Sequence, residues 1–293
     1  MKIVLLGKDG QVGSELRRSL LPLGQVIAVG RRELCLENLS DLNQFLNEQQ
    51  PHLIVNAAAY TAVDKAETDQ NRAFILNENV VSVLADYTKR SDALLVHYST
   101  DYVFDGEKDT PYLETDNANP KNVYGASKWA GDQVLHQSGC RFLNFRTSWV
   151  YSVIGHNFIK TILKLANEKD NLRIVADQFG SPTSAEMIAD VTALAIAGER
   201  KGRIETGIYH LTAAGRTSWY GLACYAVENA LMNGQKLKLK VEHIYPISTD
   251  EYPLPAKRPK NSILDSRMLS NILGLYIPDW RVYVDRFLKK DSQ

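Results

Sequence analysis

The chain has 293 residues, of which 44% are hydrophobic and 23% are charged, and its 34 basic residues balance 34 acidic residues. This composition is ordinary for a globular protein and excludes intrinsic disorder, which requires low hydrophobicity and high net charge. With a net charge of zero, we expect neither nucleic acid nor an anionic membrane as a partner. The length predicts one large domain or two.

The first residues, Met1–Gly7, carry one positive charge and an apolar run of only four residues, too short for a signal peptide or a membrane span. Three cysteines, Cys35, Cys140 and Cys224, are scattered, odd in number and without metal-ligand spacing. They indicate reduced core thiols. We therefore expect a cytoplasmic protein.

Short apolar segments alternate with longer amphipathic segments along the first 146 residues. The apolar segments are typical of parallel strands buried on both faces, and they are Lys2–Leu6, Val26–Val29, Leu53–Val55, Leu94–Tyr98 and Phe142–Phe145. The amphipathic segments have helical length, and they are Val12–Leu20, Ser40–Gln49, Asn71–Arg90 and Tyr124–Ser138. The alternation predicts an α/β fold with a Rossmann-like, doubly wound parallel sheet. Such sheets bind ligands at the carboxyl ends of their strands.

After about residue 150 the pattern loosens, and short helical segments are separated by prolines. Pro246–Pro259, rich in proline and polar residues, predicts a functional loop. We expect residues 1–150 to form the sheet domain. Residues 151–293 are expected to form mainly a smaller α/β substrate-binding domain that is interleaved with the first.

A glycine-rich segment, Gly7–Gly13, follows the first predicted strand and opens the first predicted helix. In this position Gly7, Gly10 and Gly13 would allow a tight turn, close approach of the backbone to a pyrophosphate and close packing of helix on strand. Free N–H groups and the helix dipole favour phosphate there. A purely structural turn is the alternative, but the position after the N-terminal strand favours an NAD(P)-binding domain over residues 1–150.

The second predicted strand ends in Ala28–Arg32, where dinucleotide sites usually place an acid for the ribose hydroxyls. Here the acid is missing, and Arg31 and Arg32 stand where a 2′-phosphate would lie. Because a guanidinium group donates paired hydrogen bonds to phosphate, we expect NADPH, with NADH as the second choice. Two solvated surface arginines are the alternative. The small residues of Asn56–Ala59, after the third strand, suit either a flat cofactor or the packing of the next helix.

The fourth predicted strand ends in His97–Phe104, and Tyr124 and Lys128 begin a later predicted helix. Residues four apart share a helix face, so this hydroxyl and this ammonium group can point into one site. A nearby cation would lower the pKa of Tyr124 towards neutrality and make it a proton donor and acceptor. Thr100 can add a hydrogen bond to the substrate oxygen. The combination predicts Thr100, Tyr124 and Lys128 as the catalytic set.

Together these segments resemble the extended short-chain dehydrogenase/reductases, and more closely the dTDP-4-dehydrorhamnose reductase family. The shared segments follow one order along the whole chain: Gly7–Gly13, Asn56–Asp64, His97–Phe104, Asn122–Gly125, Phe145–Tyr151, Asp177–Thr183 and Arg258–Ser262. The resemblance implies reduction of dTDP-4-dehydro-L-rhamnose to dTDP-L-rhamnose, with hydride transfer from NAD(P)H to C4. This is the last step in the synthesis of dTDP-L-rhamnose, a precursor of cell-surface polysaccharide.

The resemblance also implies binding residues. Those that border the cofactor are Gln11, Val12, Ala58, Ala59, Tyr60, Tyr98 and Lys128, and those that border the sugar are Thr100, Asp101, Tyr124 and Trp149. The indole of Trp149 follows the fifth predicted strand, where it can lie on a sugar ring or pack in the core. Arg258 and Asn261, in the proline-rich loop, are candidates for the nucleotide diphosphate, with a plain surface loop as the alternative.

Some members of the resembled family form homodimers in which carboxylates hold Mg²⁺, an ion that prefers oxygen ligands. Glu186 matches that position, although an acid there can equally complement a helix dipole. The C-terminal segment Arg286–Asp291 contains two lysines that would repel a cation. We therefore expect no metal site, a monomer or weak homodimer, and an enzyme for which Mg²⁺ is dispensable.

Three other classes of protein fit the sequence less well. Nucleotide-sugar 4,6-dehydratases place Thr-Asp-Glu after the fourth strand, whereas Tyr102 follows Asp101 here. Epimerases retain an oxidised cofactor and lack the Thr100–Asp101 pair. A non-catalytic nucleotide-binding regulatory protein on this fold would not need the intact Tyr124 and Lys128. A reductase of another 6-deoxy-4-keto nucleotide sugar stays open, because that selection depends on pocket shape.

Overall fold

The structure, a computed structural model, describes residues 1–291. Its centre is a six-stranded sheet in the order β10-β5-β4-β3-β1-β2, and every neighbouring pair in this sheet is parallel. The strands are β1 (Lys2–Leu6), β2 (Gln25–Val29), β3 (Leu53–Asn56), β4 (Leu94–Thr100), β5 (Arg141–Thr147) and β10 (Gly207–His210). The predicted doubly wound parallel sheet is confirmed.

The strands are central because their side chains are apolar on both faces. All seven residues of β4 and all four of β3 are buried, as expected for parallel strands covered on both sides. One apolar cluster includes Ile3, Leu5 and Val96, and a second cluster on the opposite face includes Val4, Leu6 and Leu95. Because successive side chains of a strand point to opposite faces, the same strands contribute to the apolar clusters on both faces of the sheet.

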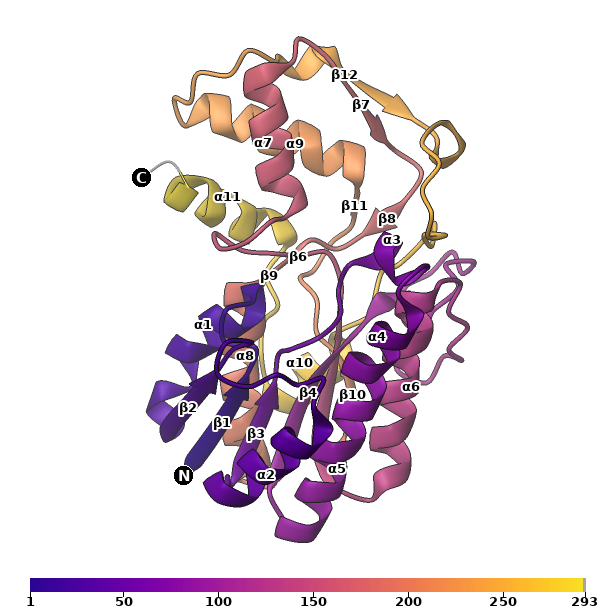
Figure 1. Cartoon of the computed structure of the whole chain (residues 1–293). Helices are drawn as coiled ribbons and strands as arrows, with labels where there is room; N and C mark the ends of the chain where they lie inside the picture. The colour runs from indigo at the N-terminus through magenta and orange to yellow at the C-terminus, as the bar shows by residue number, and fades with distance from the viewer. Residues whose placement is uncertain (292–293) are drawn as a thin grey trace.

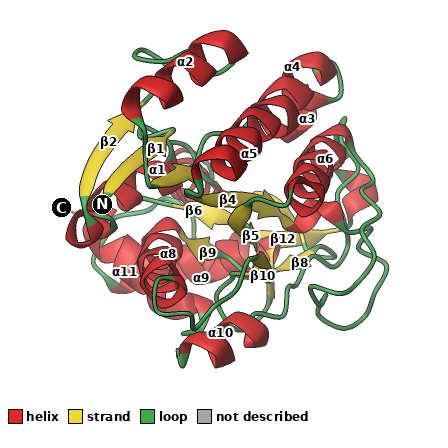
Figure 2. Cartoon of the chain, turned by 90° about the horizontal axis from the view of Figure 1, so that it is seen from below, coloured by secondary structure: helices red, strands yellow, loops and turns green. Residues whose placement is uncertain are grey.

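Helices cover both faces of the sheet (Figures 1 and 2). One layer contains α2 (Leu39–Gln49), α5 (Val80–Ser91) and α6 (Val123–Ser138), with α3 (Val63–Ala66) and α4 (Gln70–Phe74) nearby. The other layer contains α1 (Gln11–Ser19), α8 (Ala185–Glu199) and α10 (Arg267–Leu273). The second half of the chain thus contributes β10, α8 and α10 to the sheet layers, while the expected boundary at residue 150 stays a prediction.

A smaller lobe lies above the carboxyl ends of the strands (Figure 1). It contains α7 (Phe158–Glu168), α9 (Trp219–Met232) and the parallel pair β7 (Leu172–Val175) and β12 (Ile244–Ile247), which share an apolar cluster. Short strands lie between the lobes: β6 (Val150–Tyr151), β8 (Phe179–Gly180), β9 (Thr183–Ser184) and β11 (Thr217–Ser218). The C-terminal helix α11 (Trp280–Asp291) packs against α9 and β9. Within residues 1–291, no helix is long and apolar enough to cross a membrane.

Candidate active site

The glycine-rich turn joins β1 to α1 and leaves the start of this helix open to a ligand. Gly7 has a φ of +81°, and a Cβ there would lie 2.7 Å from the Ala58 backbone nitrogen. A Cβ at Gly13 would lie 2.0 Å from the Gly7 carbonyl oxygen, so Gly13 serves the packing of helix on turn. Gly10 caps α1 without a side-chain hydrogen bond. The first N–H groups of α1 therefore remain available for a pyrophosphate.

A cavity of about 1280 Å³ runs from this turn along the carboxyl ends of the strands. Most of the predicted site residues line it: Gly7, Gly10, Gln11, Val12, Arg31, Arg32, Ala58, Ala59, Tyr98, Thr100, Asp101, Tyr124, Lys128 and Trp149. Gly13, Tyr60, Arg258 and Asn261 are not among its lining residues. The glycine turn and the cavity together fit a dinucleotide.

The adenosine end of the cavity contains a carboxylate that the sequence analysis did not assign. Glu33 folds back so that one carboxylate oxygen accepts from the Gly30 N–H at 2.8 Å and the other accepts from Lys8 Nζ at 2.6 Å. Glu33, three residues after Gly30, therefore brings a carboxylate to the end of β2 that the sequence analysis did not consider. Arg31 and Arg32 are exposed at the same end of the cavity.

Tyr124 lies in the first turn of α6, and Asn122 fixes where this helix begins. Asn122 Oδ1 accepts from the Gly125 N–H at 2.8 Å, while its Nδ2 donates to the Lys257 carbonyl at 2.8 Å. Burial raises the pKa of Tyr124 to about 12, and a hydrogen bond with the Thr100 side chain only partly opposes this. The expectation that Lys128 lowers this pKa towards neutrality is therefore wrong for this structure. Tyr124 is fully protonated at neutral pH.

Lys128 is buried one helical turn beyond Tyr124. Its Nζ donates to the Tyr98 carbonyl at 2.5 Å and lies 3.2 Å from His97 Nε2. Burial lowers the pKa of Lys128 to about 8. The lysine therefore changes protonation state near physiological pH, and its nearest partners are on β4 rather than Tyr124.

Asp101 follows β4 directly and is 2% exposed. Its Oδ1 accepts from the Thr100 hydroxyl at 2.9 Å, while its Oδ2 has no hydrogen-bond partner among residues 1–291. Burial raises the pKa of Asp101 to about 7, although the side chains of Ser262 and then Thr100 stabilise the ionised form. This unpartnered oxygen belongs to a residue that lines the cavity, and it is a candidate for a substrate hydroxyl.

Trp149 is held in a left-handed backbone conformation, with a φ of +47°. One face of its indole stacks on Trp219, with 3.4 Å between ring centroids and 3° between planes. Both tryptophans line the cavity. Because Trp219 covers one face of the Trp149 indole, only the rest of this indole is available for the expected contact with the sugar. Trp219, the first residue of α9, was missed because its approach to Trp149 depends on tertiary folding.

Arg258 and Asn261 fasten the proline-rich loop to the sheet domain. Arg258 Nη2 donates to Asp64 Oδ2 at 2.8 Å, and Asn261 Nδ2 donates to the carbonyls of Lys108 and Thr110 at 2.6 and 3.1 Å. In this structure both side chains have internal partners. Their role in binding a diphosphate stays a prediction.

Comparison with known proteins places this site in a family. The family model described as "RmlD substrate binding domain" matches residues 1–293. The dTDP-4-dehydrorhamnose reductase of Burkholderia thailandensis is 48% identical over 288 residues, covering 97% of this chain and 97% of the relative. The chain belongs to the dTDP-4-dehydrorhamnose reductase family.

Solved structures agree with this family membership. A dTDP-4-dehydrorhamnose reductase from Clostridium acetobutylicum is 34% identical, with a TM-score of 0.91 and full coverage of both chains. The enzyme from Bacillus anthracis, solved in complex with NADP, is 33% identical, with a TM-score of 0.88 and 99% coverage of both chains. The sheet, the smaller lobe and the connections between them are therefore those of this reductase family.

In this family member, Asn77 is a further buried polar residue that the sequence analysis missed. It lies in a π-helical turn, Ile75–Asn79, and its Oδ1 accepts from the Tyr60 N–H at 2.9 Å. Its Nδ2 donates to the Tyr60 carbonyl at 3.1 Å and to the Ser127 hydroxyl at 2.9 Å. Asn77 thereby links the loop after β3 to α6, and both of its bonds to Tyr60 are with backbone atoms. An asparagine inside a predicted helix was the available signal.

Glu186 lies in the first turn of α8, where Arg286 Nη2 and Lys290 Nζ donate to its carboxylate at 2.6 and 3.0 Å. These cations hold the pKa of Glu186 below its usual range, although partial burial acts in the opposite direction. Among residues 1–291, no group of three or more His, Cys, Asp or Glu side chains could hold a metal ion. Arg286 and Lys290, both on α11, face Glu186, which is unfavourable for a cation beside it.

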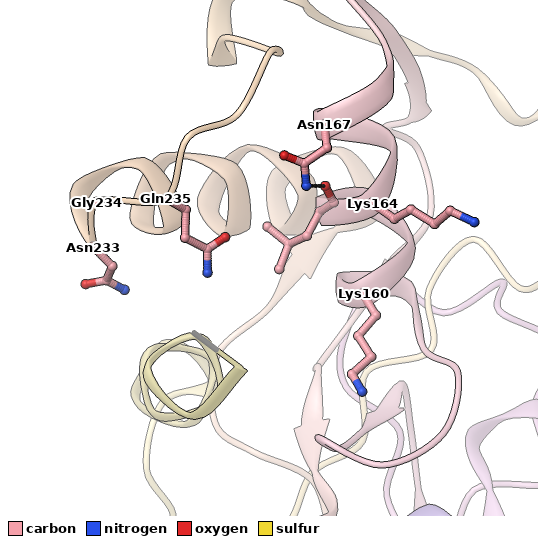
Figure 3. Close-up of a pocket in the computed structure, with 7 residues that line it drawn as sticks. Lys160, Lys164, Asn167, Asn233, Gly234 and Gln235 are labelled. Carbon is pink, nitrogen blue, oxygen red and sulfur yellow. Dashed lines mark hydrogen bonds between the residues drawn. The ribbon is translucent and has the colours of Figure 1, made fainter. Parts of the chain in front are cut away.

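A second hollow of about 580 Å³ lies between α7 and the turn after α9 (Figure 3). Its lining includes Lys160, Lys164, Asn167 and Gln235. The predicted site residues do not line it, so the candidate active site is the cavity at the carboxyl ends of the strands.

Proposed function

We propose that this protein reduces dTDP-4-dehydro-L-rhamnose to dTDP-L-rhamnose, with Tyr124 as the proton donor. The observation that carries the proposal is the meeting of the glycine turn with Thr100, Tyr124 and Lys128 on one cavity. When bound, NAD(P)H supplies the hydride that is transferred to C4 of the sugar. The curated and solved relatives, named as dTDP-4-dehydrorhamnose reductases, support the same assignment.

The raised pKa of Tyr124 suits the reductive direction. Reduction of a ketone leaves an alkoxide that needs a proton, and a phenol with a pKa of about 12 still carries its proton at neutral pH. Thr100, whose side chain interacts with Tyr124, orients the keto oxygen beside this hydroxyl. Asp101, whose Oδ2 is unpartnered among residues 1–291, accepts a hydrogen bond from a sugar hydroxyl.

For the cofactor, we propose that Gly7, Gly10, Gln11 and Val12 hold the pyrophosphate and that Ala58, Ala59, Tyr98 and Lys128 border the nicotinamide half. Arg31 and Arg32 are proposed to bind a 2′-phosphate, which gives NADPH the advantage over NADH. The Lys8–Glu33 ion pair lies at the same end of the cavity. If this ion pair opens when the cofactor binds, Lys8 becomes available to a phosphate and the Glu33 carboxylate becomes available to the ribose hydroxyls.

For the sugar nucleotide, we propose that the supported indole of Trp149 forms one wall of the sugar site. Arg258 and Asn261 contact the diphosphate after release from their partners in the loop. In solution we propose a monomer or weak homodimer whose activity does not need Mg²⁺, because Arg286 and Lys290 already neutralise Glu186. A cytoplasmic location stays an expectation.

A cofactor-oxidation assay tests the proposed function. The protein is supplied with NADPH or NADH and with 6-deoxy-4-keto sugars carried on dTDP, GDP and UDP. Oxidation with the dTDP-linked 4-dehydrorhamnose, and formation of dTDP-rhamnose by mass spectrometry, is the expected result. Turnover of a different 4-keto sugar alone would assign the protein to another reductase. No turnover with any of these sugars would contradict the proposal.

A further inference from the structure

Gly30 stands where dinucleotide sites usually place an acid after the second strand, and the space beside this glycine is occupied. A Cβ on Gly30 would lie 2.1 Å from Asp9 Oδ2, 3.2 Å from Asp9 Cγ and 3.3 Å from Glu33 Oε2. Its nearest neighbours are therefore carboxylate atoms, and the two closest belong to Asp9. Gly30 is not among the glycines with a positive φ, so its backbone conformation does not require glycine. The Asp9 carboxylate thus fills the space in which an acidic side chain at position 30 would begin.

The backbone of the glycine-rich turn brings Asp9 to the end of β2. The strands β1 and β2 are parallel neighbours, so the turn after β1 lies close to the end of β2. The N–H groups of Gly7 and Lys8 both donate to the Val29 carbonyl, at 3.0 and 3.2 Å. Because Val29 precedes Gly30, these two bonds hold the turn beside that glycine. Asp9 follows Lys8 directly, so main-chain contacts determine where its side chain starts.

The carboxylate of Asp9 is available to a ligand, whereas that of Glu33 is already engaged. Glu33 accepts from Lys8 Nζ and from the Gly30 N–H. Asp9 is exposed, lines the cavity, and its side chain makes no hydrogen bond or ion pair with another residue of the range 1–291. A hydroxyl group of a ligand can therefore donate to Asp9 without breaking a contact within the protein.

We propose that Asp9 determines cofactor specificity: its carboxylate accepts hydrogen bonds from the adenosine ribose hydroxyls of NADH and acts against the 2′-phosphate of NADPH. The inference rests on the proposed reductase function and on the cofactor site given there. Ribose hydroxyls can donate, and an ionised carboxylate can only accept. A 2′-phosphate replaces one of these donors with negative charge, which the carboxylate repels. The glycine-rich turn thereby supplies the ribose contact that usually comes from the second strand.

Asp9 opposes the cations at the same end of the cavity, where Arg31 and Arg32 are exposed. These two guanidinium groups favour a 2′-phosphate, while Lys8 is paired with Glu33. The preference for NADPH over NADH is therefore a balance of the two arginines against Asp9, and it is smaller than the arginines alone would give. Removal of the Asp9 charge should enlarge this preference and leave the pyrophosphate site intact.

Calorimetric binding of NADH and NADPH to Asp9→Asn tests the proposal without any sugar. Loss of a charged acceptor should weaken NADH binding by about tenfold, and loss of the repulsion should strengthen NADPH binding, so the ratio of the two dissociation constants should change by at least about tenfold. Asp109→Asn is the matched control, because Asp109 is exposed and lies outside the cavity. A ratio in Asp9→Asn that matches the control would overturn the proposal. No turnover is measured, so the result is independent of the sugar that the enzyme reduces.

A cofactor analogue separates ribose recognition from a general effect on the turn. NAD⁺ that lacks the adenosine 2′-hydroxyl should bind the wild type about threefold to tenfold more weakly than NAD⁺ does, and this difference should nearly vanish in Asp9→Ala. The double variant Asp9→Ala with Gly30→Asp places the acid on β2, in the space that Asp9 has left, and should recover NADH binding. Thermal melting checks that each variant is folded. If removal of the hydroxyl weakens binding equally in the wild type and in Asp9→Ala, Asp9 does not contact the ribose and the proposal is rejected.

Discussion

The indole rings of Trp149 and Trp219 lie parallel, with 3.4 Å between their centroids, although 70 positions separate them in the sequence. Trp219 belongs to the smaller lobe, and its Nε1 donates to Gln178 Oε1 at 3.2 Å. Gly180 completes the arrangement, because a Cβ there would lie 2.4 Å from Trp149 Cε2. The tryptophan proposed to contact the sugar is therefore held by residues of the second half of the chain.

Replacement of Trp219 should weaken sugar binding more than it slows the chemical step. An aromatic pair contributes about 0.5–1.5 kcal/mol beyond its buried area, so Trp219→Ala should raise KM for the sugar nucleotide by about twofold to thirteenfold. Trp219→Phe keeps a ring and should recover most of this loss. Steady-state kinetics with saturating NADPH measures both. An unchanged KM in Trp219→Ala would show that the stack does not support the sugar site.

Tyr124→Phe should reduce kcat by about 10²–10⁴-fold, because it removes the positioned proton donor and leaves the cavity intact. NADPH binding, measured by fluorescence, should be retained within about threefold. Tyr276→Phe is the matched control, since Tyr276 is 87% exposed and lies outside the cavity. Near-normal turnover of Tyr124→Phe would exclude Tyr124 as the donor.

Arg31→Ala should lower kcat/KM for NADPH by about tenfold and leave that for NADH nearly unchanged, because it removes a charged donor to a 2′-phosphate. Glu33→Gln should act in the opposite direction and favour NADPH, since it frees Lys8 from its ion pair. Binding of both cofactors by calorimetry is the independent measurement. If kcat/KM is the same for NADPH and NADH, and Arg31→Ala changes neither value, then Arg31 and Arg32 are surface arginines that do not bind the cofactor.

Chelation by EDTA should change neither the molar mass from light scattering nor the rate of turnover, because Arg286 and Lys290 occupy the carboxylate of Glu186. Glu186→Gln should lower the free energy of unfolding by about 1 kcal/mol or less, as expected for partly exposed ion pairs. Glu168→Gln, at the exposed end of α7, is a suitable control. A dimer that dissociates on chelation would show that Glu186 does hold a metal ion.

The free energy of unfolding should fall as the pH is lowered, because His210 is buried without its proton. Burial, followed by the positive charge of Arg146, lowers the pKa of His210 to about 3. Between pH 6.5 and about 3 the unfolded chain therefore binds a proton that the folded chain does not, so the stability falls as the pH falls. This contribution is about 1.4 kcal/mol per pH unit. The buried Asp101, with its pKa raised to about 7, has the opposite effect on the free energy of unfolding as the pH falls. This effect cancels when the wild type is compared with a variant that retains Asp101.

The comparison of wild type with His210→Leu isolates this effect. Urea unfolding at pH 7 and at pH 5 should show the wild type losing about 2 kcal/mol more than the variant over this interval. Loss of the same amount by both proteins would show that His210 is not the group responsible.

The sheet, and the meeting of Thr100, Tyr124 and Lys128 at one cavity, could be predicted because their signals are local. Each central strand is a short apolar run, and Tyr124 and Lys128 lie on one helix face by their spacing alone. The return of Glu33 to Gly30, the stack of Trp149 on Trp219 and the contact of His97 with Lys128 all depend on tertiary folding. The pKa of Tyr124 was misjudged for a related reason, since the burial that raises it and the contacts of Lys128 with β4 both depend on tertiary folding.

The side-chain amide of Asn122 makes two hydrogen bonds, one to α6 and one to the proline-rich loop. The same side chain that caps the start of α6 also donates a hydrogen bond to the Lys257 carbonyl of the proline-rich loop. Any displacement of the Lys257 backbone would remove one of the two anchors of this amide, two residues before Tyr124. The position of the proline-rich loop is therefore linked, through one side chain, to the start of the helix that carries Tyr124.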